Sequence, residues 1–383
     1  MLEYVVRRGT HSAKWDGVKE NYEDLIAMST ADMDFKSPKC ALDALKGYMD
    51  MGAMGYYMVP DSYYEAFTEW EEREHGYRVE REWMRVTPGV VPAFFWLLKI
   101  LVKEGDAVLV QTPAYAPFYG AIEAAGARRI EQELSRDGGR WYIDLADFEQ
   151  KIIDNDVKAF MLCSPHNPVG RVWTPGELRG MLDICRRHGV KVLADEIHQD
   201  LVMPGVKQVS AASLGEYGDM MITMTAASKT FNLAATQNSI VMIEDEGMRK
   251  DFDDLCHKYL LPSGNAFGYI AAEAAYRGGR EWLTELCGQV WTNYLYVKKT
   301  LEKELPGVTV ADLQGTYLAW VDLASVLKGR TVNEYMLRDC HISCNVGEWF
   351  GTKYANYTRL NLATSFENVT EAVRRMIEAA KIA

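Results

Sequence analysis

The alternation of short apolar runs with longer helical stretches in the middle of the chain most constrains the fold. Apolar runs with the length of strands lie at 107–110, 159–163, 190–194, 220–224 and 239–243. Helical periodicity fills intervening stretches at 92–102, 117–125 and 177–188. Strands that alternate with helices form crossover units and a mostly parallel sheet, and such sheets bind ligands beyond the carboxyl ends of their strands. The sequence therefore predicts an α/β fold with its functional residues just after each strand.

The C-terminal part has a different pattern. Helical stretches at 282–304, 332–339 and 369–380 alternate with strand-like stretches at 316–323 and 357–362. This pattern predicts a smaller α+β unit, and two glycines near 277–280 mark its boundary. The first 45 residues fit the central pattern poorly. We therefore predict a large domain over 46–279 and a small domain built from 1–45 and 280–383.

Composition excludes several classes of protein. The 383 residues are 48% hydrophobic and 25% charged, which is the balance of a globular protein with a large core. The net charge of −12 is unfavourable for nucleic acid or for a polybasic membrane surface. No signal-peptide pattern opens the sequence, and no apolar stretch reaches 18 residues. Seven irregularly spaced cysteines indicate free thiols, so we expect a cytoplasmic protein.

Two features at the first strand ends could contact a ligand. The turn Thr87-Pro88-Gly89-Val90-Val91-Pro92 begins a helix, where free N–H groups and the helix dipole favour an anion. Taken alone, an ordinary turn and cap is the more common explanation of such a segment. Tyr115 follows the 107–110 run and could stack on a flat ring, although a packing role is the common one for such an aromatic residue.

Three further strand ends carry polar groups. Asn167 lies in a rigid loop with two prolines and could donate an amide hydrogen bond, or it could be a turn residue. Asp195 ends a buried strand, where an acid is costly unless it is paired. Lys229 follows an apolar strand among small residues. Burial would lower its pKa and free the amine for a Schiff base, whereas most lysines are solvated at the surface.

Arg359 lies in the middle of the predicted strand 357–362. Alternation places it on the same face as Asn361, so its planar guanidinium could bind a carboxylate at two points. A surface salt bridge is the alternative.

Other chemistries find little support. Asp195, Glu196, His198 and Asp200 cannot all converge on a metal if the strand persists, because adjacent side chains point to opposite faces. Cys340 and Cys344 are half a zinc site at best. Neither a Gly-x-Gly-x-x-Gly fingerprint nor a Gly-x-Ser-x-Gly elbow is present. We expect no metal.

The order of these features is more specific than any one of them. A glycine turn, a tyrosine, Asn-Pro-x-Gly, an aspartate, Ser-Lys and an arginine follow one another along nearly the whole chain. This order resembles the fold-type I pyridoxal 5′-phosphate (PLP) enzymes, the aspartate aminotransferase superfamily. The strings Ala31-Asp32-Met33-Asp34-Phe35 and Asp195-Glu196-Ile197-His198 are similar to the MalY/PatB-type cystathionine β-lyase branch.

The resemblance implies a role for each matching residue. Lys229 would form the Schiff base with PLP, Asp195 would pair with the pyridine nitrogen, and Tyr115 would stack on the ring. These three are the implied catalytic residues. The other implied cofactor contacts are Val90, Val91, Asn167, His198, Ser228 and, from a second subunit, Tyr56. The implied substrate-binding residues are Arg359, Asp32 and Asn167.

The branch resemblance favours a C–S β-lyase that cleaves cystathionine or a related cysteine S-conjugate to a thiol, pyruvate and ammonia. The same residues would also serve an aminotransferase, and a regulatory protein could retain the PLP fold. A homodimer with shared active sites, acting on a small amino-acid substrate, is implied.

Four departures from the family pattern bear on these roles. Ala226 stands where many relatives carry a phosphate-binding serine, and Gln237 stands where aminotransferases often carry a phosphate-binding arginine. The segment after the Arg359 strand reads Ala363-Thr364-Ser365-Phe366 in place of a Pro-Arg-like segment, and Asn345-Val346-Gly347 replaces a more usual Pro-Gly. The last two changes leave the particular substrate open.

Overall fold

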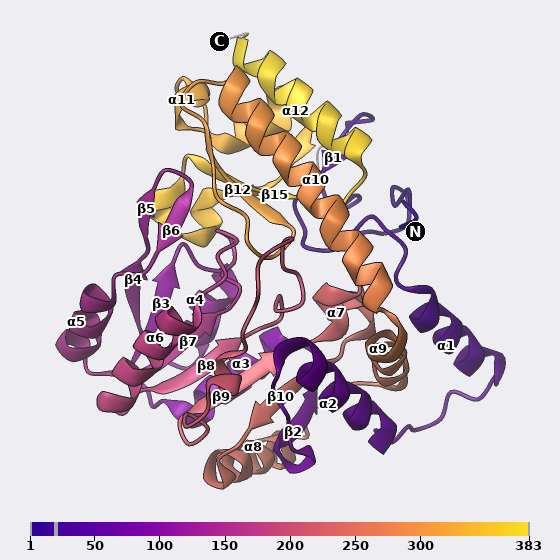
Figure 1. Ribbon diagram of the computed structural model, residues 1–383, viewed down its shortest axis with the longest axis vertical. Coiled ribbons are helices and arrows are strands. Elements are labelled where there is room, and N and C mark those ends of the chain that lie inside the picture. Colours follow the sequence, from indigo (N-terminus) through magenta and orange to yellow (C-terminus); the bar gives the residue numbers. More distant parts are fainter. Residues whose placement is uncertain (1, 19–21, 382–383) are drawn as a thin grey trace.

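The computed structural model of the chain describes residues 2–18 and 22–381. Its centre is a seven-stranded sheet in the order β2-β10-β9-β8-β7-β3-β4 (Figure 1). The strands are β2 (Met84–Thr87), β3 (Ala107–Thr112), β4 (Arg128–Glu133), β7 (Val157–Cys163), β8 (Lys191–Asp195), β9 (Met221–Thr225) and β10 (Ser239–Ile243). Neighbouring strands from β9 to β4 pair in parallel, and β10 is antiparallel to both of its neighbours. The predicted mostly parallel sheet is therefore confirmed.

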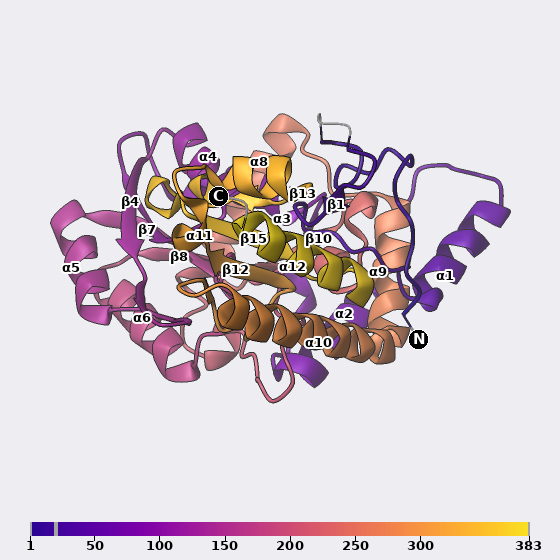
Figure 2. The ribbon, with the colours of Figure 1, turned by 90° about the horizontal axis from the view of Figure 1, so that it is seen from above.

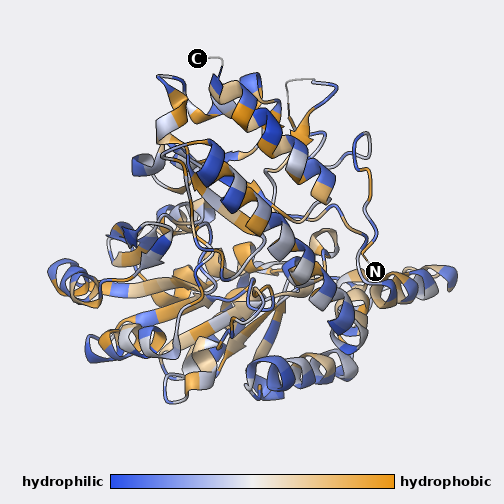
Figure 3. Ribbon diagram, turned by 45° about the horizontal axis from the view of Figure 1, so that its top comes forward, coloured by the Kyte–Doolittle hydropathy of each residue, from blue (hydrophilic) through white to orange (hydrophobic). Residues whose placement is uncertain are grey.

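Helices cover both faces of this sheet, which explains why its strands read as continuous apolar runs. Val108 and Val110 face one layer and Ala107 and Leu109 face the other, as the pleat requires. The first layer is α3 (Val90–Leu101), α4 (Ala116–Ala124) and α8 (Glu246–Tyr259). The second layer is α2 (Asp61–His75), α5 (Leu145–Asn155), α6 (Pro175–Arg187) and α9 (Ala266–Gly278). Figure 3 shows the hydrophobic strands between these helices.

A smaller antiparallel sheet follows, in the order β11-β12-β15-β14. Its strands are β11 (Thr309–Val310), β12 (Leu318–Asp322), β14 (Asn345–Val346) and β15 (Tyr357–Asn361). The long helix α10 (Arg280–Glu304) and the closing helix α12 (Phe366–Lys381) run side by side over this unit (Figure 2). The strand β1 (Ile26–Ala27) pairs in parallel with β13 (Ile342–Ser343), which joins the N-terminal segment to the C-terminal unit.

Short elements connect these units. They are the hairpin β5 (Ser135–Asp137) and β6 (Arg140–Tyr142), the one-turn helices α7 (Ala227–Thr230) and α11 (Ala324–Leu327), the π-helical η4 (Glu334–Asp339), and the 3₁₀ turns η1 (Arg81–Trp83), η2 (Ala211–Leu214), η3 (Ala234–Thr236), η5 (Gly347–Phe350) and η6 (Thr352–Tyr354). None of the helices in the described part of the chain has the length and apolar character needed to cross a bilayer.

The helix α1 (Lys39–Asp50) packs on α9 at the edge of the molecule, and the loop from α1 to α2 reaches outward from it (Figures 1 and 2). This segment exposes large apolar side chains, among them Met51, Met54, Tyr56 and Met58. Such a surface is unusual for a monomer and typical of a protein interface.

Candidate active site

Most of the predicted site residues meet in one cavity of about 180 Å³, at the edge where parallel strands end. Those that line it are Val90, Val91, Tyr115, Asn167, Asp195, His198, Ser228 and Lys229. Residues from five separate stretches of the chain thus surround one space. Tyr56, Asp32 and Arg359 do not line it.

Lys229 lies in the single turn of α7, and its amine donates a 2.7 Å hydrogen bond to the backbone carbonyl of Ala31. Burial and the nearby Arg359 guanidinium lower the pKa of Lys229 to about 8. The amine is therefore deprotonated much more readily than that of an ordinary lysine, which is the property that a Schiff-base lysine needs.

Asp195 is the last residue of β8, and its carboxylate accepts a 3.1 Å hydrogen bond from the backbone N–H of Ile197. Burial raises the pKa of Asp195 to about 6, although the Ile197 N–H and the Lys229 amine oppose the increase. A cationic ring nitrogen would stabilise this carboxylate further. The neighbouring Glu196 carboxylate instead accepts from the backbone of Ala211. Within residues 2–18 and 22–381, no three metal-binding side chains are grouped to hold a metal ion.

Arg359 lies in β15 and is 2% exposed. Its guanidinium donates to Asn167 Oδ1 at 3.1 Å, to Asn345 Oδ1 at 2.7 Å and to the Ser29 carbonyl at 3.3 Å. All three acceptors are neutral, and burial lowers the pKa of Arg359 to about 10. Its positive charge is thus held in the interior without a carboxylate among these acceptors, which suits an anionic ligand.

Asn345 was not predicted as a site residue, because its contact with Arg359 depends on the pairing of β14 with β15. The sequence marks it only as a departure from the family pattern.

The helix α3 begins at Val90, next to Gly89 and the cavity. The first N–H groups of a helix have no acceptor within the helix, so they are available to an anion. Ser228, Gln237 and Asn238 line the same cavity. This part of the cavity therefore offers neutral donors and a helix start, and the residues that line the cavity include no arginine.

Tyr115 precedes α4, and the edge of its ring meets Trp349 with centroids 5.4 Å apart. Burial raises the pKa of Tyr115, so the phenol is neutral at physiological pH. His198 is buried, and its Nδ1 has no partner among the described residues. Burial, with Lys229 and Arg359, lowers its pKa well below the usual value, so His198 is a neutral ring. The ring-stacking and cofactor-contact roles stay predictions.

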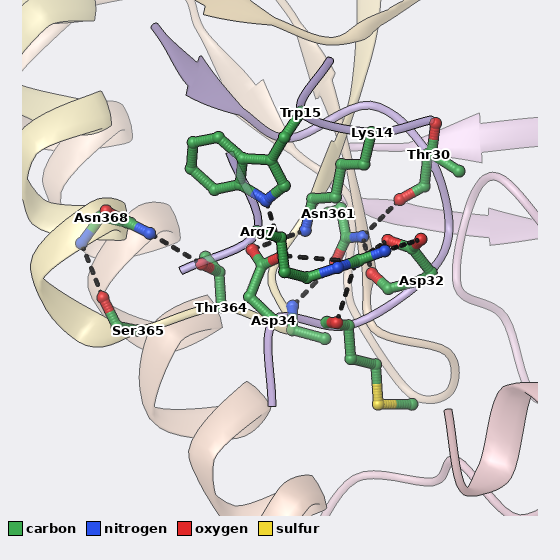
Figure 4. A network of polar contacts seen from close by, with 12 residues as sticks. Arg7, Lys14, Trp15, Thr30, Asp32, Asp34, Asn361, Thr364, Ser365 and Asn368 are labelled. Carbon is green, nitrogen blue, oxygen red and sulfur yellow. Dashed lines mark hydrogen bonds and ion pairs between the residues drawn. The ribbon is translucent and has the colours of Figure 1, made fainter. Parts of the chain in front are cut away.

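Asp32 is held outside the cavity by an ion pair. Its two carboxylate oxygens accept from Arg7 at 2.7 and 2.8 Å (Figure 4). Asn361, the strand neighbour of Arg359 on the same face, donates to the backbone carbonyls of Thr30 and Asp32 at 2.6 Å each. A substrate-binding role for Asp32 stays a prediction, and in this structure its carboxylate is engaged by Arg7.

A second ion pair, Lys14 with Asp34, lies close to the pair of Arg7 with Asp32. Lys14 and Asp34 are fully buried and bond at 2.8 Å, and the Trp15 indole N–H donates to the other Asp34 oxygen at 2.8 Å (Figure 4). These contacts fix residues 30–34 and, with them, the Ala31 carbonyl that accepts from Lys229. Sequence reasoning missed this network, because its partners are distant in the chain.

Comparison with known proteins places the chain in a family. Residues 23–376 match the class I and II aminotransferases, so the chain belongs to this family. Cystathionine beta-lyase PatB of Bacillus subtilis is 35% identical over 374 residues, which are 97% of each chain. The resemblance to that branch is therefore confirmed.

Two solved structures extend the comparison. Cystalysin of Treponema denticola, whose structure contains a PLP cofactor, has a TM-score of 0.94 and 32% identity over 100% of this chain and 99% of that one. The PLP-bound C–S lyase of Staphylococcus hominis has a TM-score of 0.93 and 28% identity over 99% and 97% of the two chains. The PLP fold type I expected from the sequence is confirmed.

Proposed function

We propose that this protein is a PLP-dependent C–S β-lyase that cleaves cystathionine or a related cysteine S-conjugate to a thiol, pyruvate and ammonia. The observation that carries the proposal is one cavity that combines the Lys229 amine of lowered pKa with the buried Asp195 carboxylate. The name of the 35% identical relative supports the choice of reaction.

The donor set fits PLP group by group. Lys229 would bind its aldehyde carbon, Asp195 its protonated ring nitrogen and Asn167 its ring hydroxyl group. The N–H groups of Val90 and Val91, with Ser228, would hold its phosphate. Tyr115 and His198 would contact its ring. When bound, PLP supplies an electron-withdrawing ring that stabilises negative charge at the substrate α-carbon.

The chain's own residues would bind, orient and deprotonate the substrate. Arg359 would bind the α-carboxylate together with Asn167, because its buried charge faces neutral acceptors. Lys229 would take the α-proton, because its pKa of about 8 leaves a much larger fraction of free amine than an ordinary lysine has. Asp195 would keep the ring nitrogen protonated. The apolar cavity wall would exclude water, which lowers the local dielectric constant and strengthens each contact between charged groups.

An aminotransferase is the second candidate, and the class I and II aminotransferase match favours it. The two reactions differ in what happens after the α-proton is removed. A lyase expels a thiol from the β-carbon, whereas an aminotransferase returns a proton to a neighbouring carbon. The residues above serve both reactions.

The assembly and location are also proposals. The exposed methionines and tyrosines of 51–58 support a homodimer in which Tyr56 reaches the phosphate site of the partner subunit. Seven free cysteines support a cytoplasmic location. The two-domain division at 46–279 also stays a proposal. Its second boundary coincides with the start of α10, whereas its first boundary falls inside α1.

Two measurements test the proposed function. Purified protein with added PLP should show the long-wavelength absorption band of a Schiff base, and Lys229→Ala should lack it. Incubation with cystathionine should then release equal amounts of pyruvate, ammonia and thiol. Glutamate formation from alanine and 2-oxoglutarate without thiol release would favour the aminotransferase, and absence of the band in the wild type would exclude both.

A further inference from the structure

A buried carboxylate lies behind the helical turn that carries Lys229. Asp200 follows Asp195 by five residues, and its side chain is 4% exposed. Three side chains donate to it: Trp70 at 2.9 Å and His75 at 2.8 Å to Oδ1, and Thr230 at 2.6 Å to Oδ2. We call these four residues, Trp70, His75, Asp200 and Thr230, the anchor cluster.

The cluster contains an ion pair at neutral pH. Burial by itself lowers the pKa of His75, but Glu71 and Asp200 outweigh it and raise the value to about 9. Burial by itself raises the pKa of Asp200. The hydrogen bond and charge of His75, with the Thr230 hydroxyl, outweigh burial, so the pKa of Asp200 lies below its usual value. The other carboxyls that face the pair are Glu71 and Glu196, whose pKa values burial raises to about 8 and about 7.

A buried ion pair is a poor source of net stability, because desolvation offsets the attraction between the charges. Its hydrogen bonds are nevertheless directional, so they fix the relative positions of the segments that they join. Here they join three segments: α2, the loop after β8, and α7. Lys229 lies in α7, and Asp195 is the last residue of β8, directly before the loop that carries Asp200.

Thr230 directly follows Lys229 in a helix of one turn, which has little rigidity of its own. The bond from Thr230 to Asp200 therefore fixes the Lys229 backbone, while the Lys229 side chain lines the cavity and its amine donates to the Ala31 carbonyl. We propose that the anchor cluster is a positioning device, which holds Lys229 at a set distance from Asp195 so that both reach one cofactor. This inference rests on the proposed PLP function.

The test compares holoenzymes of the wild type, Thr230→Val, Thr230→Ser and His75→Gln. Thr230→Val replaces the hydroxyl group with a methyl group and so removes the hydrogen bond to Asp200, and Thr230→Ser keeps the hydroxyl group. We expect Thr230→Val to halve the visible circular dichroism of bound PLP and to shift the midpoint pH of its absorption band by at least half a pH unit. We also expect kcat to fall about tenfold with KM within twofold. Thr230→Ser should restore all three values. His75→Gln removes the charged partner at Asp200 Oδ1, and we expect it to change the same three quantities in the same direction as Thr230→Val.

A matched control is Thr68→Val, which removes a 3.2 Å hydrogen bond to the Val79 carbonyl on the same helix, α2, outside the cluster. It should leave dichroism, band midpoint and kcat unchanged. The inference is overturned if Thr230→Val and His75→Gln lower only the melting temperature and leave the cofactor signals and kcat at wild-type values. If one variant does not fold, the other decides. Absence of the band in the wild type would instead refute the proposed function.

Discussion

The contact between Asn345 and Arg359 gives a sharp test of the substrate carboxylate site. Asn345→Asp keeps the shape of the side chain and places a negative charge where the neutral Oδ1 now accepts at 2.7 Å from the guanidinium. The introduced carboxylate would neutralise Arg359 and repel the substrate. Two carboxylates on one guanidinium lie about 5 to 6 Å apart, where like charges repel by about 3 kcal/mol at an effective dielectric constant of about 20.

That repulsion corresponds to a roughly 100-fold lower kcat/KM, with most of the change in KM. The assay follows pyruvate release from cystathionine through a coupled dehydrogenase. Asn345→Ala is the control, because it removes one acceptor and adds no charge, and we expect it to cost less than about fivefold. If Asn345→Asp stays within threefold of the wild type, Arg359 does not bind the substrate carboxylate.

Three further predictions follow from the buried charges. Lys14→Met removes the buried ammonium partner of Asp34 and leaves the carboxylate with the neutral Trp15 indole at 2.8 Å. It should lower the free energy of unfolding by about 3 kcal/mol in urea titration, whereas the exposed Lys46→Met should not change it measurably; equal effects would refute the reasoning. PLP association with the apoprotein should accelerate about tenfold from pH 7 to pH 9 and then level off, because the Lys229 pKa of about 8 sets the free-amine fraction; a continued rise to pH 10.5 would indicate an ordinary lysine. Asp195→Asn should retain the cofactor band but lose at least 100-fold in kcat, since a neutral amide cannot keep the ring nitrogen protonated; unchanged kcat would remove Asp195 from the mechanism.

Much of the fold could be predicted from local patterns. The five apolar runs predicted in the centre became β3, β7, β8, β9 and β10, because strands buried on both faces must be apolar throughout. The edge strand β4 was missed, since four of its six residues are exposed and its sequence Arg-Arg-Ile-Glu-Gln-Glu contains no apolar run. The position of Lys229, Asp195 and Asn167 after strands indicated one shared site, because parallel strands end at the same edge.

The sequence by itself determined the fold class and the residues that could carry PLP chemistry, because strand ends and motif order are local properties of the chain. Only the tertiary structure decided which charges meet. It paired Arg7 with Asp32, brought Asn345 to Arg359, and tied Thr230 to Asp200 and His75. These contacts join segments that are distant in sequence, and a side chain's pKa depends on the partners and burial that folding gives it. Local pattern carries no record of that environment, so the electrostatics of the site became visible only once the chain was folded.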